Sequence, residues 1–274
     1  MGKIADALER HDKETVVRVE DVKQELPKRL VVEEPEVAVA KEAVFQRELS
    51  EELVSLTAPD SADAECFRVL RGQILFQKGR PVPKSIVVTS ALPGEGKTYV
   101  AANLSVILAL SIDENVIAID ADLRRPRMHN FFGYRKIRGL HEYLLGGLRS
   151  EDLILKSGID KLSVLPAGKI ARNATELLSS NMMVTFLEEV KEKFRDYFVI
   201  IDSPPCRIGA ETKALARLVD GIVLVVKAGK TPKKEIEKAI DTLGRDKILG
   251  IVFNGYEEVR KNYYRYYDRY YKSK

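Results

Sequence analysis

The segment Ala91-Leu-Pro-Gly-Glu-Gly-Lys-Thr98 is the feature that most constrains the fold of this chain. It follows the apolar run 85–89 and precedes a stretch of helical character near 97–111. Its spacing matches the Walker A phosphate-binding loop, with Ala91 in place of the first glycine. Gly94 and Gly96 permit a tight turn in which successive N–H groups point at phosphate oxygens, and the following helix presents its positive end to them. We therefore expect a strand, a phosphate-binding loop and a helix, in that order.

Apolar runs and helical stretches alternate along the rest of the chain. Further strands are predicted at 116–119, 198–201, 221–226 and 248–253, with a weaker candidate at 161–165, and helices near 61–77, 174–195, 211–218 and 231–243. The strand segments are continuously apolar, as expected when both faces of a sheet are covered. This alternation predicts the α/β fold of a P-loop NTPase, with a mostly parallel sheet flanked by helices, of the SIMIBI or MinD-like kind.

We divide the 274 residues into three parts. Residues 1–60 form an N-terminal extension that we expect to be mostly flexible, 61–255 form the P-loop domain, and 256–274 form a C-terminal tail. The net charge of +4 is too small to indicate a nucleic-acid partner. Because no apolar run approaches the roughly 20 residues that span a bilayer, and no signal peptide begins the chain, we expect a cytoplasmic protein.

Two of the predicted strands end in carboxylates. Asp120 and Asp122 follow one apolar run, and Asp202 ends another. Ligands of open α/β sheets bind outside the carboxyl ends of the strands, so these side chains are expected beside the phosphate-binding loop. Three carboxylates there would repel one another without a cation, which predicts Mg²⁺ bound with Thr98, phosphate oxygens and water.

The phosphate-binding loop predicts a nucleotide, ATP, as the ligand. In this interpretation Lys97 reaches the β- and γ-phosphates. The residues expected to line the nucleotide site are Ala91, Pro93, Gly94, Glu95, Gly96, Lys97, Thr98 and Tyr99.

The tail is dense in phenols: seven of the 11 tyrosines fall in the last 19 residues. An ATP site and a row of tyrosine acceptors in one chain suggest an enzyme that phosphorylates other copies of itself. The expected acceptors are Tyr263, Tyr264, Tyr266, Tyr267, Tyr270 and Tyr271. Each phosphate would add about −1.5 to −2 charge to a tail that is basic when unmodified.

Two further segments carry motifs, Asp120-Ala-Asp-Leu-Arg-Arg-Pro126 and Ile201-Asp-Ser-Pro-Pro205. They resemble the second Walker motif, A′, and the Walker B motif of the bacterial tyrosine kinases of the CpsD and CapB kind, which accompany capsule and exopolysaccharide synthesis. Glu65, Arg68 and Arg71 match the family's ExxRxxR oligomerisation motif. These three residues share a broad helix face, on which they could pair with a neighbouring subunit or remain a solvated charged face.

The resemblance implies autophosphorylation of the tail in trans, within a ring of subunits and with MgATP as donor. It implies Lys97, Asp120 and Asp122 as catalytic residues, with Asp120 or Asp122 accepting the phenol proton. It also implies Thr98, Asp120 and Asp202 as ligands of Mg²⁺, and Asn254 as a contact to the base. It also implies a membrane polysaccharide copolymerase that recruits the protein to the inner face of the membrane, and a protein-tyrosine phosphatase that reverses the modification.

Two other interpretations compete with the kinase. A ParA- or MinD-like ATPase would use the same loop as a positioning or assembly switch, but Leu92 occupies the place of that group's signature lysine. A non-catalytic scaffold would not need the full set of Lys97, Thr98 and three aspartates. Cys206, close to the Walker B-like segment, is expected to be a small buried residue rather than a redox switch.

Overall fold

The computed structural model describes residues 48–77, 79, 81–110, 115–135, 137–207 and 210–256. All of them lie in the compact unit Glu42–Lys274. The tail acceptors from Tyr263 to Tyr271, and most of the predicted N-terminal extension, lie outside the described residues.

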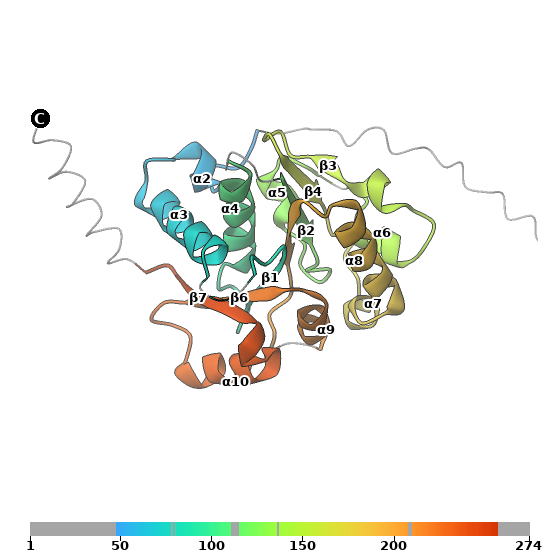
Figure 1. Ribbon diagram of the computed structural model, residues 1–274. Coiled ribbons are helices and arrows are strands. Elements are labelled where there is room, and N and C mark those ends of the chain that lie inside the picture. The colour runs from blue at the N-terminus through green and yellow to red at the C-terminus, as the bar shows by residue number, and fades with distance from the viewer. Residues whose placement is uncertain are drawn as a thin grey trace, which may run out of the picture. The chain divides into compact units, whose positions relative to one another are not determined.

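The described residues form strands and helices in alternation (Figure 1). The strands are β1 Ser85–Ser90, β2 Asn115–Asp120, β3 Leu155–Lys156, β4 Leu162–Leu165, β5 Tyr197–Asp202, β6 Gly221–Lys227 and β7 Ile248–Asn254. The helices are α2 Val54–Thr57, α3 Ala62–Leu75, α4 Lys97–Ala109, α5 Met128–Phe131, α6 Leu140–Leu144, α7 Ala174–Leu178, α8 Asn181–Lys193, α9 Glu211–Leu218 and α10 Lys233–Leu243. Two short 3₁₀ turns, η1 Ser150–Leu153 and η2 Arg245–Lys247, complete the set.

The strands form one sheet in the order β3-β4-β2-β5-β1-β6-β7. All pairings are parallel except that of β3 with β4. The register sets Asp120 at the end of β2 opposite Asp202 at the end of β5, and β1 leads into the Walker A segment beside them. The predicted mostly parallel α/β fold is therefore confirmed, and the sheet brings the acidic strand ends to the loop.

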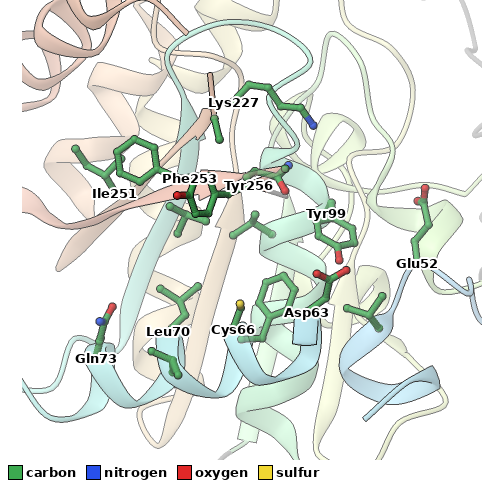
Figure 2. Close-up of a pocket in the computed structure, with 18 of the residues that line it drawn as sticks. Glu52, Asp63, Cys66, Leu70, Gln73, Tyr99, Lys227, Ile251, Phe253 and Tyr256 are labelled. Carbon is green, nitrogen blue, oxygen red and sulfur yellow. The ribbon is translucent and has the colours of Figure 1, made fainter. Parts of the chain in front are cut away.

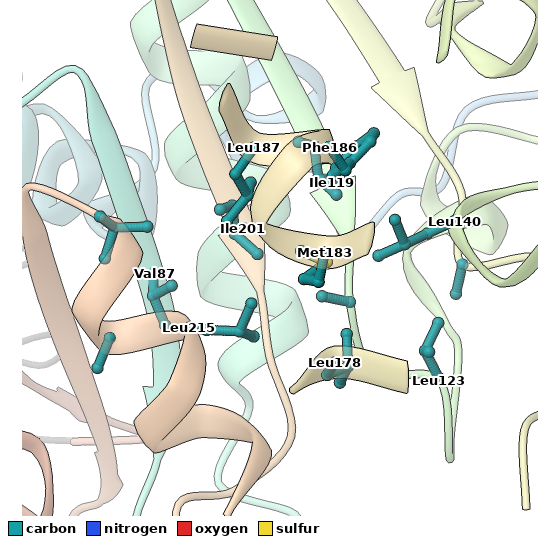
Figure 3. Packing of buried hydrophobic residues seen from close by; sticks show 14 of the residues in the cluster. Val87, Ile119, Leu123, Leu140, Leu178, Met183, Phe186, Leu187, Ile201 and Leu215 are labelled. Carbon is teal, nitrogen blue, oxygen red and sulfur yellow. The ribbon is translucent and has the colours of Figure 1, made fainter. Parts of the chain in front are cut away.

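Apolar side chains on successive strand residues pack on opposite faces of the sheet. On β1, Val87 belongs to one buried cluster, whereas Ile86 and Val88 belong to the other. Helices α6 to α10 cover the first face, and Figure 3 shows Ile119 of the sheet next to Phe186 of α8, and Ile201 next to Leu187. Helices α3, α4 and α5 cover the second face. This two-sided burial explains why the strand segments are continuously apolar.

Helix boundaries differ from the sequence prediction in two places. The single helix predicted over 174–195 is two helices, because the Ser180 hydroxyl accepts a hydrogen bond from the Met183 N–H and caps a new helix. The last helix, predicted from residue 231, begins at Lys233, because Pro232 occupies the N-cap position and the Thr231 hydroxyl hydrogen-bonds to the Glu95 carboxylate.

Packed structure also begins before residue 61, within the segment expected to be mostly flexible. Leu53 is fully buried, and the Ser55 N–H donates to the Asn103 side chain of α4 at 3.1 Å. The Asn103 amide in turn donates to the Glu52 carbonyl at 2.9 Å. Residues 50–57 are therefore attached to the helix that follows the Walker A loop. No helix in the described part of the chain is long and apolar enough to cross a bilayer.

Candidate active site

The Walker A segment turns through two glycines into α4. Gly94 and Gly96 have φ of +80° and +91°, in the left-handed region that favours glycine. Gly96 is the N-cap of α4, and no side chain caps that helix. The first N–H groups of α4 thus keep their hydrogen-bonding capacity for a ligand, as a phosphate site requires.

The side chains of Glu95, within the loop, and of Asn254 stabilise this loop. The Glu95 carboxylate accepts the Leu92 N–H at 2.7 Å and the Thr231 hydroxyl. The Asn254 side-chain amide, at the end of β7, donates to the Glu95 carbonyl at 2.8 Å. The Glu95 carboxylate is therefore directed away from the face a phosphate would occupy, so any contact of Glu95 with nucleotide would come from its backbone. The Ala91 side chain is likewise fully buried in the apolar core.

Lys97 lies among the predicted carboxylates. Its ammonium is 2.7 Å from Asp122 Oδ2, 3.7 Å from Asp202 Oδ1 and 3.3 Å from the Thr98 hydroxyl. Burial acts to lower the pKa of Lys97, but the negative charges of Asp202 and Asp122 outweigh it and the net pKa is raised. Lys97 therefore stays protonated at neutral pH and offers a fixed positive charge.

Asp120 is fully buried and holds the backbone of the next loop. Its carboxylate accepts N–H groups from Asp122 at 3.1 Å, Arg127 at 3.1 Å and Met128 at 3.0 Å. Burial, and then the charge of Asp202, raise the pKa of Asp120 to about 8. An uncompensated carboxylate is thus unfavourable at this position.

Asp202 is the best candidate for a cation ligand. It is fully buried, and neither oxygen has a hydrogen bond of ordinary geometry to a described residue, although the nearby Thr98 hydroxyl and Lys97 favour its charged form. Burial raises the pKa of Asp202 to about 6. No three His, Cys, Asp or Glu side chains of the described residues form a metal cage by themselves. A single buried carboxylate, that of Asp202, beside a phosphate-binding loop fits Mg²⁺, which commonly takes one or two carboxylates with phosphate oxygens and water.

A cavity of about 920 Å³ opens over the loop. Asp122 lines it, whereas Asp120 does not. Its other lining residues include Pro93, Gly94, Gly96, Lys97 and Thr98 of the loop, Arg124, Arg125, Arg127 and Arg172 from two further segments, and Pro204 and Pro205. A side chain that entered this cavity would therefore meet Lys97 and Asp122 together.

A second cavity, of about 980 Å³, lies between α3 and β7 (Figure 2). Cys66, Leu70 and Gln73 of α3 line one side of it, and Phe253 of β7 and Tyr256 line the other. Tyr99 lines both cavities, and Asn254 lines only this one. The predicted contact of Asn254 with a base, which would lie on this side of the loop, stays a prediction.

The predicted oligomerisation residues make contacts within the chain. The Arg68 guanidinium pairs with Glu65 at 2.6 Å and donates to the Pro59 carbonyl at 2.9 Å. Arg71 donates to the Ile107 carbonyl in the last turn of α4 at 3.0 Å. All three are only partly buried, so their role toward another subunit stays a prediction.

The sequence did not single out three further residues of the site, Glu211, Thr175 and Arg172. The Arg124 guanidinium donates to the buried Glu211 carboxylate and to the Thr175 hydroxyl, both at 2.8 Å. Arg172 reaches the cavity from the segment between β4 and α7. No motif marks Glu211, Thr175 or Arg172, so only the folded chain reveals their position. Cys206 is buried, as expected, and burial raises the pKa of its thiol to about 11.

Comparison with known proteins identifies the family. The family described as "ParA: NUBPL iron-transfer P-loop NTPase" matches residues 81–262. Tyrosine-protein kinase YwqD of Bacillus subtilis is 37% identical over 217 residues, which cover 78% of this chain and 90% of that protein. This chain belongs to the bacterial tyrosine-protein kinases. Its P-loop NTPase fold implies that the enzyme binds a nucleotide with a divalent metal ion.

Solved structures agree with this assignment. The kinase domain of the Escherichia coli tyrosine kinase ETK is 30% identical, with a TM-score of 0.70, over 77% of this tyrosine kinase and 82% of that chain. The septum site-determining protein MinD of Pyrococcus horikoshii is 24% identical, with a TM-score of 0.54, over 64% of this chain and 71% of that one. The likeness to MinD concerns the fold alone. The predicted kinase assignment and the predicted MinD-like fold are both confirmed.

Proposed function

We propose that this tyrosine kinase uses MgATP to phosphorylate the tyrosines of its own tail, from Tyr263 to Tyr271, in trans within a ring of identical subunits. The modification would regulate the synthesis and export of an exopolysaccharide or capsule. A membrane polysaccharide copolymerase would recruit the otherwise cytoplasmic enzyme to the membrane, and a phosphatase would reset it. Kinship with the bacterial tyrosine kinases and the tyrosine content of the tail support this proposal.

The observation that carries the proposal is the open cavity in which Lys97 and Asp122 lie 2.7 Å apart. A phosphoryl transfer enzyme needs fixed positive charge at the phosphates and a proton acceptor within reach of the incoming hydroxyl. In this site Lys97 and the N–H groups of α4 would bind the phosphates. Thr98 and Asp202 would hold Mg²⁺, with Asp120 nearby, and the bound ion would neutralise charge on the transferred group.

The geometry favours Asp122 over Asp120 as proton acceptor. Asp122 lines the cavity, whereas Asp120 is sealed from it and already accepts three backbone N–H groups. In the proposed step the phenol oxygen bonds to the γ-phosphorus and the bond to the oxygen of ADP breaks. The phenol proton passes to the Asp122 carboxylate, while Lys97 stays protonated throughout.

The nucleoside and the subunit contacts complete the proposal. Because the Asn254 amide is committed to the Glu95 carbonyl, a contact of Asn254 with the base would use its side-chain oxygen. Glu65, Arg68 and Arg71 would exchange part of their present contacts for a neighbouring subunit, on the exposed side of α3.

The direct test mixes two forms of the full chain. A Lys97→Met chain keeps the tail, and its partner keeps Lys97 but has the six tail tyrosines changed to phenylalanine. With MgATP we expect phosphotyrosine on the Lys97→Met chain only when both are present. A chain with Lys234→Met, an exposed lysine of α10, should label itself as wild type does. ATP hydrolysis without phosphotyrosine in any mixture would instead support a ParA-like switch.

The choice of base has its own test. Asp122→Asn should lower kcat for tail phosphorylation by about 10²–10⁴-fold, while nucleotide affinity changes little. Retention of near-normal kcat in Asp122→Asn, with loss in Asp120→Asn, would move the proton acceptor to Asp120.

A further inference from the structure

Three arginines at the rim of the active-site cavity are not used by the reaction described so far. The cations that line the cavity are Lys97, Arg124, Arg125, Arg127 and Arg172, and the carboxylates are Glu52 and Asp122. Lys97 pairs with Asp122, and Arg124 pairs with Glu211. Arg125, Arg127 and Arg172 are exposed and form no ion pair with any described residue. We call these three residues the arginine rim.

The backbone of the rim is fixed by hydrogen bonds to the carboxylates of Asp122 and Asp120. The Arg125 N–H donates to Asp122 Oδ1 at 3.0 Å, and the Arg127 N–H donates to Asp120 Oδ2 at 3.1 Å. The segment that carries Arg172 is tied to the same loop, because the Ala171 N–H donates to the Leu123 carbonyl at 2.9 Å. Three unpaired guanidinium groups are thus held at one cavity, beside the proposed proton acceptor.

Unpaired guanidinium groups at a cavity favour an anion with several oxygens, above all a phosphate. The phosphates of the nucleotide already have the N–H groups of α4, Lys97 and a divalent ion. The rim therefore suits a second anion that arrives with the tyrosine. The unmodified tail cannot supply it readily, since from Tyr256 onward it carries six Lys and Arg against three Asp and Glu, and the rim would repel it.

The tail sequence changes this balance after one reaction. Its acceptors come in adjacent pairs, Tyr263-Tyr264, Tyr266-Tyr267 and Tyr270-Tyr271. Adjacent residues have Cα atoms about 3.8 Å apart, so both members of a pair reach the mouth of the cavity together, one as a phosphate and the other as a phenol. Each phosphate adds about −1.5 to −2 charge at pH 7.

We propose that the arginine rim binds a phosphotyrosine next to the acceptor, so that the first phosphorylation of a tail primes the next. The preferred substrate is then a peptide that already carries one phosphotyrosine beside a free tyrosine. This inference rests on the proposed tail phosphorylation and adds an order to it: a slow first transfer and faster later ones.

The first test follows the full chain with MgATP by intact mass spectrometry. Priming predicts that heavily phosphorylated chains accumulate while a large unmodified fraction remains. Arg172→Ala should shift this pattern toward the random distribution of independent sites. Arg195→Ala, an exposed arginine that precedes β5 at the opposite end of the sheet, should keep the wild-type pattern. A random distribution for the wild-type chain would overturn the priming, whereas no phosphate in any chain would overturn the kinase proposal itself.

The second test measures binding directly. A fluorescent peptide of residues 261–266 with phosphotyrosine at 264 should bind the nucleotide-loaded chain about tenfold or more tightly than the unphosphorylated peptide, the effect of one charge-assisted hydrogen bond. Arg172→Ala and Arg125→Ala should remove this difference. If these variants instead weaken ATP binding and leave the peptide difference unchanged, the rim serves the nucleotide and the inference is wrong.

Discussion

The contact between Gly96 and Asn254 gives a quantitative prediction about the Walker A loop. A Cβ atom added at Gly96 would lie 2.0 Å from Asn254 Nδ2, far inside van der Waals contact. A Cβ at Gly94 would meet nothing within 4 Å. Both glycines have positive φ, so alanine at either position costs about 1–3 kcal/mol of backbone strain. Of the two added Cβ atoms, only that at Gly96 would meet Asn254.

Gly96→Ala must also displace the Asn254 side chain and break its hydrogen bond to the Glu95 carbonyl. That loss costs a further ~1–3 kcal/mol in the free energy of unfolding, the price of leaving a partly buried group unpaired. For a domain of this size the added cost corresponds to about 2–12 °C in Tm. Gly96→Ala should accordingly be less stable than Gly94→Ala by this amount.

The assay is urea unfolding of the two variants in the absence of nucleotide, so that no ligand contributes. Asn254→Ala is then combined with each of them in a double-mutant cycle. The additional cost of Gly96→Ala should disappear in the Asn254→Ala background, while the cost of Gly94→Ala should not change. Equal stabilities for Gly96→Ala and Gly94→Ala, or purely additive effects with Asn254→Ala, would refute the argument.

Three other predictions concern stability and reactivity. Without metal and nucleotide, the pKa of Asp120 is raised in the folded state, so the folded state holds a proton that the unfolded state releases. The free energy of unfolding should therefore fall as pH rises from about 4 to about 8. Urea titrations across this range should show a flatter dependence for Asp120→Asn. Leu53→Ala should lower the free energy of unfolding by about 2–5 kcal/mol and open the chain to limited proteolysis near residue 57, since Leu53 is fully buried; unchanged stability would contradict its packing. A thiol reagent at pH 7.5 should label the exposed Cys66 and leave Cys206 unmodified, as mass spectrometry of the labelled chain can check.

The sequence predicted those parts of the fold that local pattern and parallel topology determine. The apolar run identified β1, and the glycines identified the loop that follows it. Because ligands bind at the carboxyl ends of parallel strands, Asp120 and Asp202 could be predicted to lie close together before the register was known. The helix break at Ser180 was missed because the apolar pattern continues across it, and only the cap hydrogen bond shows where the second helix starts. Leu53 was missed because α2 is too short to have a helical period.

The candidate site was predictable to the extent that it consists of motifs. Lys97 and Thr98 were recognised from the spacing of the loop, and the structure brings Lys97 to Asp122 and Asp202. Arg172 and Glu211 lie far from these motifs along the chain, and tertiary contacts alone bring them in. Glu95 was expected at the nucleotide site because of its place in the motif; the sequence did not predict that its carboxylate supports the loop from behind, and its contact with nucleotide stays a prediction.

Arg71 lies on the surface of α3 and donates a hydrogen bond to the Ile107 carbonyl in the last turn of α4. Helix α4 begins at Lys97, so this single helix connects the proposed subunit face with the phosphate end of the active site. A neighbouring subunit that bound Arg71 would break its hydrogen bond to the Ile107 carbonyl and destabilise the last turn of α4. Substitution of Arg71 would therefore disturb the proposed assembly and nucleotide binding together, whereas substitution of Glu65 or Arg68 would affect the proposed assembly alone.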